Sequence, residues 1–126
     1  MTVQRLALDA GALIAMERRK LRAIRFLDLA ARGDALLSVP GPVIAEWWRA
    51  RSEWREHILD AVQVEPVSLR ILQSAGEAIA AVAGATTIDA IVMAFAAARG
   101  ATVVTGDLDD LERLRSAFPG VRVLSV

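Results

Sequence analysis

The order of apolar and polar positions along the chain predicts strands that alternate with helices. Short apolar runs bounded by turn residues or charges are typical of buried strands, which we expect at 5–8, 36–39, 62–64, 101–105 and 121–124. The segments between them carry apolar residues at helical spacing, and we expect helices at 12–18, 20–32, 43–51, 53–61, 69–82, 88–98 and 108–118.

Strands separated by helices indicate right-handed crossover connections and a sheet covered on both faces. We therefore predict a three-layer α/β/α fold with a mainly parallel sheet of four to five strands. The length of 126 residues suits a single domain, 1–126, and no segment has the composition of a linker or a repeat. In such sheets ligands bind beyond the carboxyl ends of the strands, so polar residues at that edge are candidates for a site.

Composition narrows the setting of the protein. The hydrophobic content of 55% comes largely from alanine, and the most apolar window, 79–98, is interrupted by Thr86, Thr87 and Asp89, so we expect a buried helix and no membrane span. The absence of cysteine excludes disulfides and thiolate chemistry, and the amino terminus lacks a secretory pattern, so we expect a cytoplasmic protein. Basic and acidic residues balance at 15 each, so any nucleic acid must be held locally.

Four acidic residues lie where predicted core segments meet solvent. Asp9 and Asp107 follow strands, Glu46 lies in the helix after a strand, and Asp89 lies in the first turn of the helix at 88–98. Taken singly, the three aspartates have an ordinary interpretation as residues that cap or favour helix starts. Glu46 lies in an apolar run where we expect burial on most sides, although a surface pair with Arg49 is the competing interpretation.

Taken together, the four acids favour a metal site. Clustered carboxylates repel one another and raise their own pKa values unless a divalent cation offsets the charge. Carboxylate oxygens suit Mg²⁺ or Mn²⁺, whereas zinc is disfavoured because the chain has no cysteine and a single histidine, His57, which we expect to be a surface or packing residue. Phosphate-binding glycine loops and a serine nucleophile elbow are absent, so metal-assisted hydrolysis is the chemistry that remains.

The blocks that carry these acids resemble a known family. LDAGALIA at 8–15, PVIAEW at 42–47, TIDAIV at 87–92 and VVTGDLDDL at 103–111 look like the four acidic blocks of PIN-domain ribonucleases, in the family's order and over almost the whole chain. The size and the closing strand are similar to those of the VapC toxins of bacterial toxin–antitoxin pairs.

The resemblance implies roles for particular residues. Asp9, Glu46, Asp89 and Asp107 would form the catalytic Mg²⁺ site, in which Mn²⁺ can substitute, and Thr105 would support it by hydrogen bonding. Asp110 matches a further acid of some members, although an acid that complements the helix dipole is an equal interpretation. The chain departs from the family at Gly11, where many members carry Ser or Thr.

The implied activity is Mg²⁺-dependent endonucleolytic hydrolysis of RNA phosphodiester bonds. An acidic pocket repels RNA, so contacts to the RNA backbone must come from a basic rim, with candidates Arg18, Arg22, Arg25 and Arg49. A solvated face is an equal interpretation of the basic helix. Three tryptophans, Trp47, Trp48 and Trp54, are more often core or interface residues than base-stacking platforms. The family further implies a homodimer and a cognate antitoxin, in agreement with spare apolar surface around Trp47 and Trp48.

Two rival functions stay open at the level of sequence. A Mg²⁺-dependent phosphatase on a similar sheet would carry an Asp-x-Asp motif or a late lysine, but this chain has Asp9-Ala10-Gly11 and no lysine after Lys20. A non-catalytic PIN-like module that binds RNA or antitoxin is disfavoured by the presence of all four acids.

Overall fold

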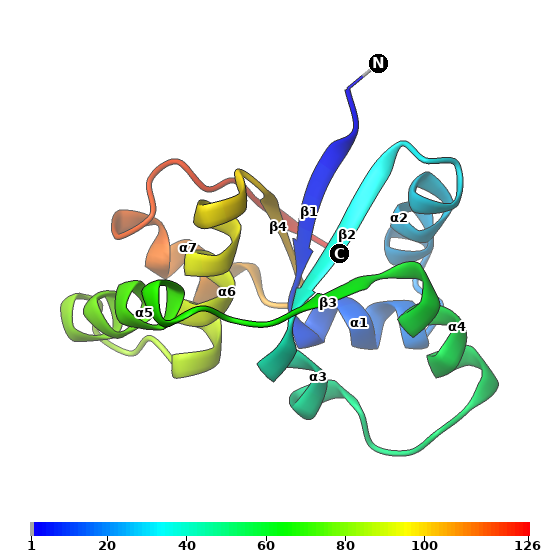
Figure 1. Ribbon diagram of the computed structural model, residues 1–126, viewed down its shortest axis with the longest axis horizontal. Coiled ribbons are helices and arrows are strands. Elements are labelled where there is room, and N and C mark those ends of the chain that lie inside the picture. The colour runs from blue at the N-terminus through cyan, green and yellow to red at the C-terminus, as the bar shows by residue number, and fades with distance from the viewer. Residues whose placement is uncertain (1) are drawn as a thin grey trace.

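Five parallel strands form one sheet in the computed structural model, which describes residues 2–126 (Figure 1). The strands are β1 (Gln4–Leu8), β2 (Ala35–Pro40), β3 (Gln63–Glu65), β4 (Thr102–Thr105) and β5 (Val123–Ser125). Their order across the sheet is β3-β2-β1-β4-β5, and every neighbouring pair is parallel. The predicted sheet is confirmed, with β1 in the middle of it.

Helices cover both faces of this sheet, so the three-layer prediction is also confirmed. They are α1 (Ala10–Glu17), α2 (Leu21–Ala31), α3 (Gly41–Trp47), α4 (Glu53–Ala61), α5 (Leu69–Ala81), α6 (Thr87–Arg99) and α7 (Leu108–Arg113). The chain moves from β1 outward to β3 and then returns past β1 to β4, and right-handed crossovers place helices on opposite faces for the two directions. In Figure 1, α1–α4 accordingly lie on one side and α5–α7 on the other.

The direction of the chain reverses between β1 and β4, so the crevice that doubly wound sheets form at such a point is placed at the carboxyl ends of these two strands. Leu8 lies opposite Val104 in the β1–β4 ladder, so Asp9 and Thr105 come next on neighbouring strands. The backbone N–H of Asp9 donates to the carbonyl oxygen of Val104 at 3.3 Å and extends this pairing. The reversal point is where doubly wound sheets bind their ligands.

The core explains why the central segment is so apolar. Helix α6 packs against β1, β2 and β4 on one side and against α5 on the other, and its residues from Ala90 to Ala96 are buried. The expectation of a buried helix is therefore confirmed. Within residues 2–126, no helix is both long and apolar enough to cross a membrane.

The observed element boundaries differ from the predicted ones at a few points. Helix α3 ends at Trp47, short of the predicted Arg51, because Trp48 has extended backbone angles. Helix α1 begins at Ala10 rather than Ala12, because Asp9 caps it, and α7 gives way after Arg113 to a 3₁₀ turn, Leu114–Ser116. The last strand begins at Val123 rather than at 121. None of these differences moves a predicted acid away from the edge of the sheet.

Candidate active site

Asp9 is the most firmly held acid of the site. It is only 7% exposed, and its Oδ1 accepts hydrogen bonds from the backbone N–H groups of Ala12 at 2.8 Å and Gly106 at 3.3 Å. Its Oδ2 accepts a hydrogen bond from the hydroxyl of Thr105, the residue that the family resemblance led us to expect as a hydrogen-bonding support of the site. Burial raises the pKa of Asp9 above its ordinary value, the three hydrogen bonds oppose the shift, and the charge of Asp107 adds to it. Asp9 thus caps α1 and still lies in the crevice.

Two glycines make this arrangement of Asp9 possible. A Cβ atom added at Gly11 would lie 2.8 Å from the Cα and 2.9 Å from the nitrogen of Gly106, and a Cβ at Gly106 would lie 2.8 Å from the Cα of Gly11. The two backbones touch, so any side chain at either position collides with main-chain atoms that cannot rotate away. The contact lets the N–H of Gly106 reach Asp9, which explains why Gly11 stands where the resemblance led us to expect a hydroxyl.

Asp89 lies across the crevice from Asp9. Its backbone N–H donates to the Oγ1 of Thr86 at 3.2 Å, so Thr86 is the capping residue and Asp89 lies one turn into α6 with its carboxylate half-buried. Burial raises the pKa of Asp89, and the charges of Asp9 and Asp107 raise it further. Asp89 therefore lies in the first turn of α6, as the interpretation that it favours the helix start requires, and it also lies close enough to Asp9 and Asp107 for their charges to affect its pKa.

The predicted burial of Glu46 is wrong. Glu46 is exposed, because α3 directs Val43 and Trp47 into the core and Glu46 toward solvent. The carboxylate nevertheless lies close to the other acids. Partial desolvation raises its pKa most, the charges of Asp89 and Asp9 raise it further, and the charge of Arg49 opposes the shift. Arg49 donates to the carbonyl oxygens of Ala45 and Trp48, and no ion pair joins it to Glu46 among the described residues.

Asp107 and Asp110 lie on the β4 side of the crevice. Asp107 is exposed and caps α7, and its N–H donates to the Oγ1 of Thr105 at 2.9 Å, so Thr105 links Asp9 to Asp107. A side-chain hydrogen bond with Asp107 raises the pKa of Asp110, and the charges of Asp107 and Asp89 act in the same direction. Asp110 therefore keeps its proton to a higher pH than an isolated aspartate would.

The four acids share one edge of the sheet but are not drawn together around one point. In the part of the chain that the structure describes, no three acidic or histidine side chains lie close enough to hold one metal ion as they stand. The donor set nevertheless fits a hard divalent cation, because it consists of carboxylate oxygens, and burial and the neighbouring acids raise the pKa values of Asp9, Glu46 and Asp89.

The predicted basic rim is only partly placed near these acids. Arg18 lines a small cavity together with Gly11 and Gly106, and Arg49 comes three residues after Glu46, beyond the end of α3. Arg22 and Arg25 instead line a cavity of about 500 Å³ between α2, α7 and β5, together with Glu112. Sequence reasoning missed Arg113, whose Nη2 lies 3.9 Å from Asp110 and whose charge lowers the pKa of Asp89. Its spacing of one turn from Asp110 was the available signal.

The tryptophans have structural positions. Trp47 is only 2% exposed and belongs to the core, so the expected apolar surface around Trp47 and Trp48 is wrong as to Trp47; Trp48 is half-buried against it. The guanidinium of Arg19 lies 4.1 Å from the centroid of the Trp54 ring, and the ring of His57 stacks on the Trp54 ring with centroids 5.1 Å apart. These contacts, with the hydrogen bond from the indole to the carbonyl oxygen of Met16, favour a packing role for Trp54 over base stacking.

The protein is a doubly wound α/β protein that carries acidic residues where the direction of its parallel sheet reverses. Its family follows from a comparison with family models, in which the PIN domain model matches residues 6–116. The chain belongs to the PIN domain family, whose members are generally nucleases.

Solved structures share this fold. A structure of VapBC2 from Rickettsia felis, bound to a DNA fragment from the promoter of the pair, matches with a TM-score of 0.74 and 17% identity over 98% of this chain and 99% of that chain. DNA-bound VapBC from Salmonella typhimurium matches with 0.70 and 19%, covering 98% of each chain, and FitAcB from Neisseria gonorrhoeae with 0.63 and 18%, covering 94% of this chain and 96% of that one. No curated protein matches the chain in sequence. These likenesses show that the fold is of the VapC type.

Proposed function

We propose that the protein is a Mg²⁺-dependent endoribonuclease and the toxic component of a toxin–antitoxin pair. The observation that carries the proposal is the set of Asp9, Glu46 and Asp89 on three different elements at one sheet edge, each with a raised pKa caused partly by another acid or by burial. Membership of the PIN family and the similarity to the VapBC2 and FitAcB structures support the same function. The absence of cysteine suits a reducing, cytoplasmic setting.

In this proposal the acids have different roles in holding the metal ion. Asp9 and Asp89 would hold the ion from the two sides of the crevice, with Glu46 and Asp107 at its margins, and Mn²⁺ would substitute for Mg²⁺. Such an ion, when bound, polarises the scissile phosphate and lowers the pKa of the attacking water. Thr105 would keep Asp9 and Asp107 in register through its two hydrogen bonds, and Asp110 would hold or release a proton beside Asp107.

Phosphates of the RNA on either side of the cleaved bond would meet arginines at the rim. Arg49 lies on the Glu46 side, Arg18 lines a cavity with Gly11 and Gly106, and Arg113 lies on the Asp89 side. Arg22 and Arg25 are proposed as more distant contacts, since they line a separate cavity. Because these residues recognise the backbone, they contribute affinity but no sequence preference.

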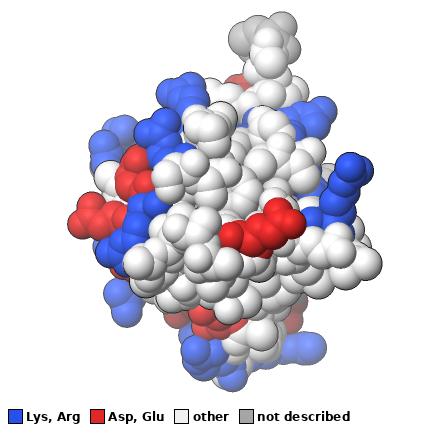
Figure 2. Space-filling model, turned by 90° about the vertical axis from the view of Figure 1, so that its left-hand side faces the viewer, with Lys and Arg blue, Asp and Glu red and all other residues white. Residues whose placement is uncertain are grey.

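The proposed homodimer and antitoxin need exposed apolar surface, and helix α5 supplies it. Leu69 is 70% exposed and Leu72 44%, and Figure 2 shows that the face on this side is largely uncharged, with basic groups mainly at its margins. Burial of apolar area provides affinity for a partner, and an inserted Arg or Lys would complement the acidic crevice.

The proposed function is tested by expressing the chain alone and mapping RNA ends after a brief induction, followed by cleavage of the same RNA with purified protein. We expect growth arrest and defined cuts that require Mg²⁺ or Mn²⁺ and stop when the metal is chelated. Retained arrest without any cut would support the non-catalytic binding module instead. Hydrolysis of a phosphomonoester with intact RNA would favour the phosphatase.

Glu46→Gln preserves the shape of the side chain and removes its charge. We expect it to abolish metal-dependent cleavage and to leave the free energy of unfolding equal or higher, because Glu46 is exposed and its charge is repelled by Asp89 and Asp9. Cleavage assays and thermal melts of the metal-free protein measure the two effects. Wild-type cleavage would return Glu46 to the role of a surface residue.

The raised pKa values predict the pH dependence. Asp9, Glu46 and Asp89 keep their protons to a higher pH when folded than when unfolded, so at a Mg²⁺ concentration that leaves most of the protein metal-free, acidification should stop cleavage above the usual carboxyl range. For the same reason the folded state binds more protons there, and the stability of the metal-free protein should fall as the pH rises through the raised values. A pH–rate profile and melts across the same range check both signs; an acid limb at the ordinary value for aspartate would contradict the proposed coupling.

A further inference from the structure

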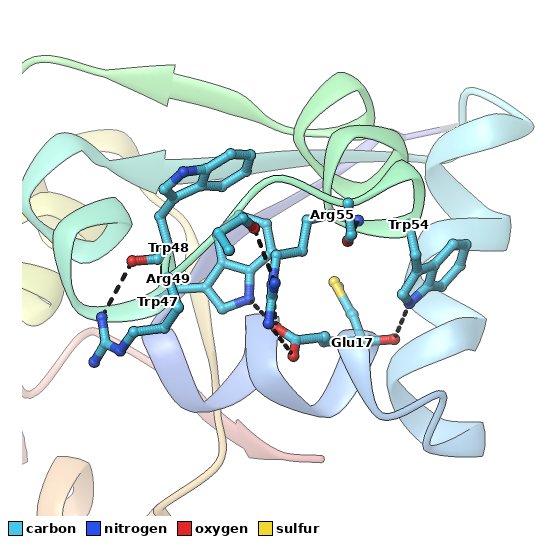
Figure 3. Close-up of polar contacts among 9 residues, drawn as sticks. Glu17, Trp47, Trp48, Arg49, Trp54 and Arg55 are labelled. Atoms are coloured by element: carbon cyan, nitrogen blue, oxygen red, sulfur yellow. Dashed lines mark hydrogen bonds and ion pairs between the residues drawn. The ribbon is translucent and has the colours of Figure 1, made fainter.

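Glu17 joins two helices next to the active site. It is the last residue of α1, and its Oε1 accepts hydrogen bonds from the indole Nε1 of Trp47 at 2.9 Å and from Nε of Arg55 at 3.1 Å. Its Oε2 accepts from Nη2 of Arg55 at 2.9 Å. Figure 3 shows the carboxylate of Glu17 lying between the two donors. We refer to Glu17, Trp47 and Arg55 as the Glu17 cluster.

The Glu17 cluster binds residues at both ends of the segment 48–52, which connects α3 to α4. Trp47 is the last residue of α3, and Arg55 lies in the first turn of α4. Arg55 also donates through Nη1 to the carbonyl oxygen of Ala50 at 2.8 Å, within the segment between the two helices. The indole of Trp54 adds a bond to the carbonyl oxygen of Met16 at 3.0 Å. The carboxyl end of α1 therefore sets the position of α3 and α4 together.

Helix α3 depends on such outside support. It has seven residues, no side-chain hydrogen bond caps its first turn, and the chain leaves it at Trp48 with extended angles. So short a helix is marginal by itself and is positioned by what it packs against. Its buried side chains are Val43 and Trp47, and of these Trp47 also has a polar atom bound to another element.

Glu46 precedes Trp47 on this helix and is repelled by the other acids. Since Glu46 is exposed, its own side chain contributes no packing that would hold it near the crevice. The negative charges of Asp89 and Asp9 push it away. The bond from Trp47 to Glu17 acts one residue further along the same helix and opposes that displacement.

We propose that Glu17 is a positioning residue of the nuclease site, which keeps Glu46 within reach of Asp9 and Asp89 by anchoring Trp47 and the start of α4. This inference rests on the proposed function, because it assigns Glu46 to the reaction. Glu17 itself touches neither RNA nor metal, and acts through the orientation of α3.

The chain offers a matched control in a second ion pair. Arg99 donates through Nε and Nη2 to Oε1 of Glu65 at 3.1 and 3.0 Å, and the side chains of Glu65 and Arg99 are 30% and 26% exposed. Those of Glu17 and Arg55 are 29% and 20% exposed. The control pair joins β3 to the end of α6; the backbone of Glu65 lies beside Pro40 and Gly41 at the start of α3, but its side chain bonds to Arg99, so Glu65→Ala leaves the backbone contact in place. Glu17→Ala and Glu65→Ala therefore remove equivalent interactions at different places.

The first measurement is hydrogen exchange of the metal-free protein, followed at the backbone amides of Trp47 and Trp48. We expect Glu17→Ala to speed this exchange about tenfold or more relative to wild type, with α6 still protected, and Glu65→Ala to leave it unchanged. The second is RNA cleavage by the metal-loaded protein. We expect kcat to fall about tenfold or more for Glu17→Ala at an unchanged KM for RNA, and to stay within about twofold for Glu65→Ala.

Trp47→Phe keeps an aromatic ring in the core but lacks the indole donor. If Glu17→Ala does not fold, the same exchange and cleavage measurements are made on Trp47→Phe. We expect it to reproduce the loss of α3 protection and of kcat, and Glu17→Gln, which retains an acceptor for the indole, to restore part of both. Unchanged exchange at α3 in Trp47→Phe, or faster exchange with full kcat, would overturn the inference. An inactive wild type with the expected exchange pattern would instead refute the proposed function alone.

Discussion

Asp89→Asn should abolish RNA cleavage, by about 100-fold or more, while leaving the metal-free protein as stable as wild type or more so. Asp89 is half-buried in the first turn of α6, where burial and the charges of Asp9 and Asp107 raise its pKa. The amide has the same shape and carries no charge, so it relieves the cost of an ionised group there and removes a proposed metal ligand at the same time. RNA cleavage and thermal melts measure the two consequences.

The metal provides a second measurement for the same variant. We expect millimolar Mn²⁺ to raise the melting temperature of wild type and to leave that of Asp89→Asn unchanged, since only a ligand that binds the folded state shifts the unfolding equilibrium. Asp28→Asn, an exposed acid on α2, is the control and should behave as wild type in both assays. Full activity in Asp89→Asn, or an equal response to Mn²⁺, would mean that the site has been misplaced.

Gly11→Ala should destabilise the protein by about 1–3 kcal/mol and reduce cleavage. The added Cβ would lie 2.8 Å from the Cα of Gly106, so the backbone must shift, and the bond from Gly106 to Asp9 is the first to be lost. Denaturant unfolding and cleavage assays test the two effects. Gly11→Ser should fare no better, because the collision involves the Cβ that both side chains share and not the hydroxyl.

The control for this substitution is Gly76→Ala in α5. Apart from its chain neighbours and the nearby backbone of α5, no atom of the described residues lies within 4 Å of a Cβ at Gly76, so that exchange gains helix propensity without a collision and should stabilise by about 0.5–1 kcal/mol. Opposite signs at two helical glycines would separate the close approach from the ordinary cost of glycine in a helix. Equal stabilisation by Gly11→Ala and Gly76→Ala would contradict the prediction, because it would show that the backbone at Gly106 moves aside at little cost.

Much of the fold was readable from the sequence because local pattern and tertiary packing agree in this chain. The apolar runs and the helical stripes appear as the strands and helices of a doubly wound sheet, and Gly100 ends α6 in a left-handed conformation as a glycine at that position should. The placement of Asp9 and Asp107 directly after β1 and β4 followed from chain order alone. The family follows from ordered motifs and is shown by the match over residues 6–116.

Burial and long-range contacts were decided only by the tertiary structure. Glu46 and Trp47 are neighbours in one apolar run, yet the angle of α3 against α1 exposes the first and buries the second. The touching backbones of Gly11 and Gly106 and the pairing of Glu17 with Arg55 join segments far apart in sequence. Periodicity reports which face of an element is apolar, but the distance between two such elements depends on how they pack, and that distance determines whether separate acids act as one site.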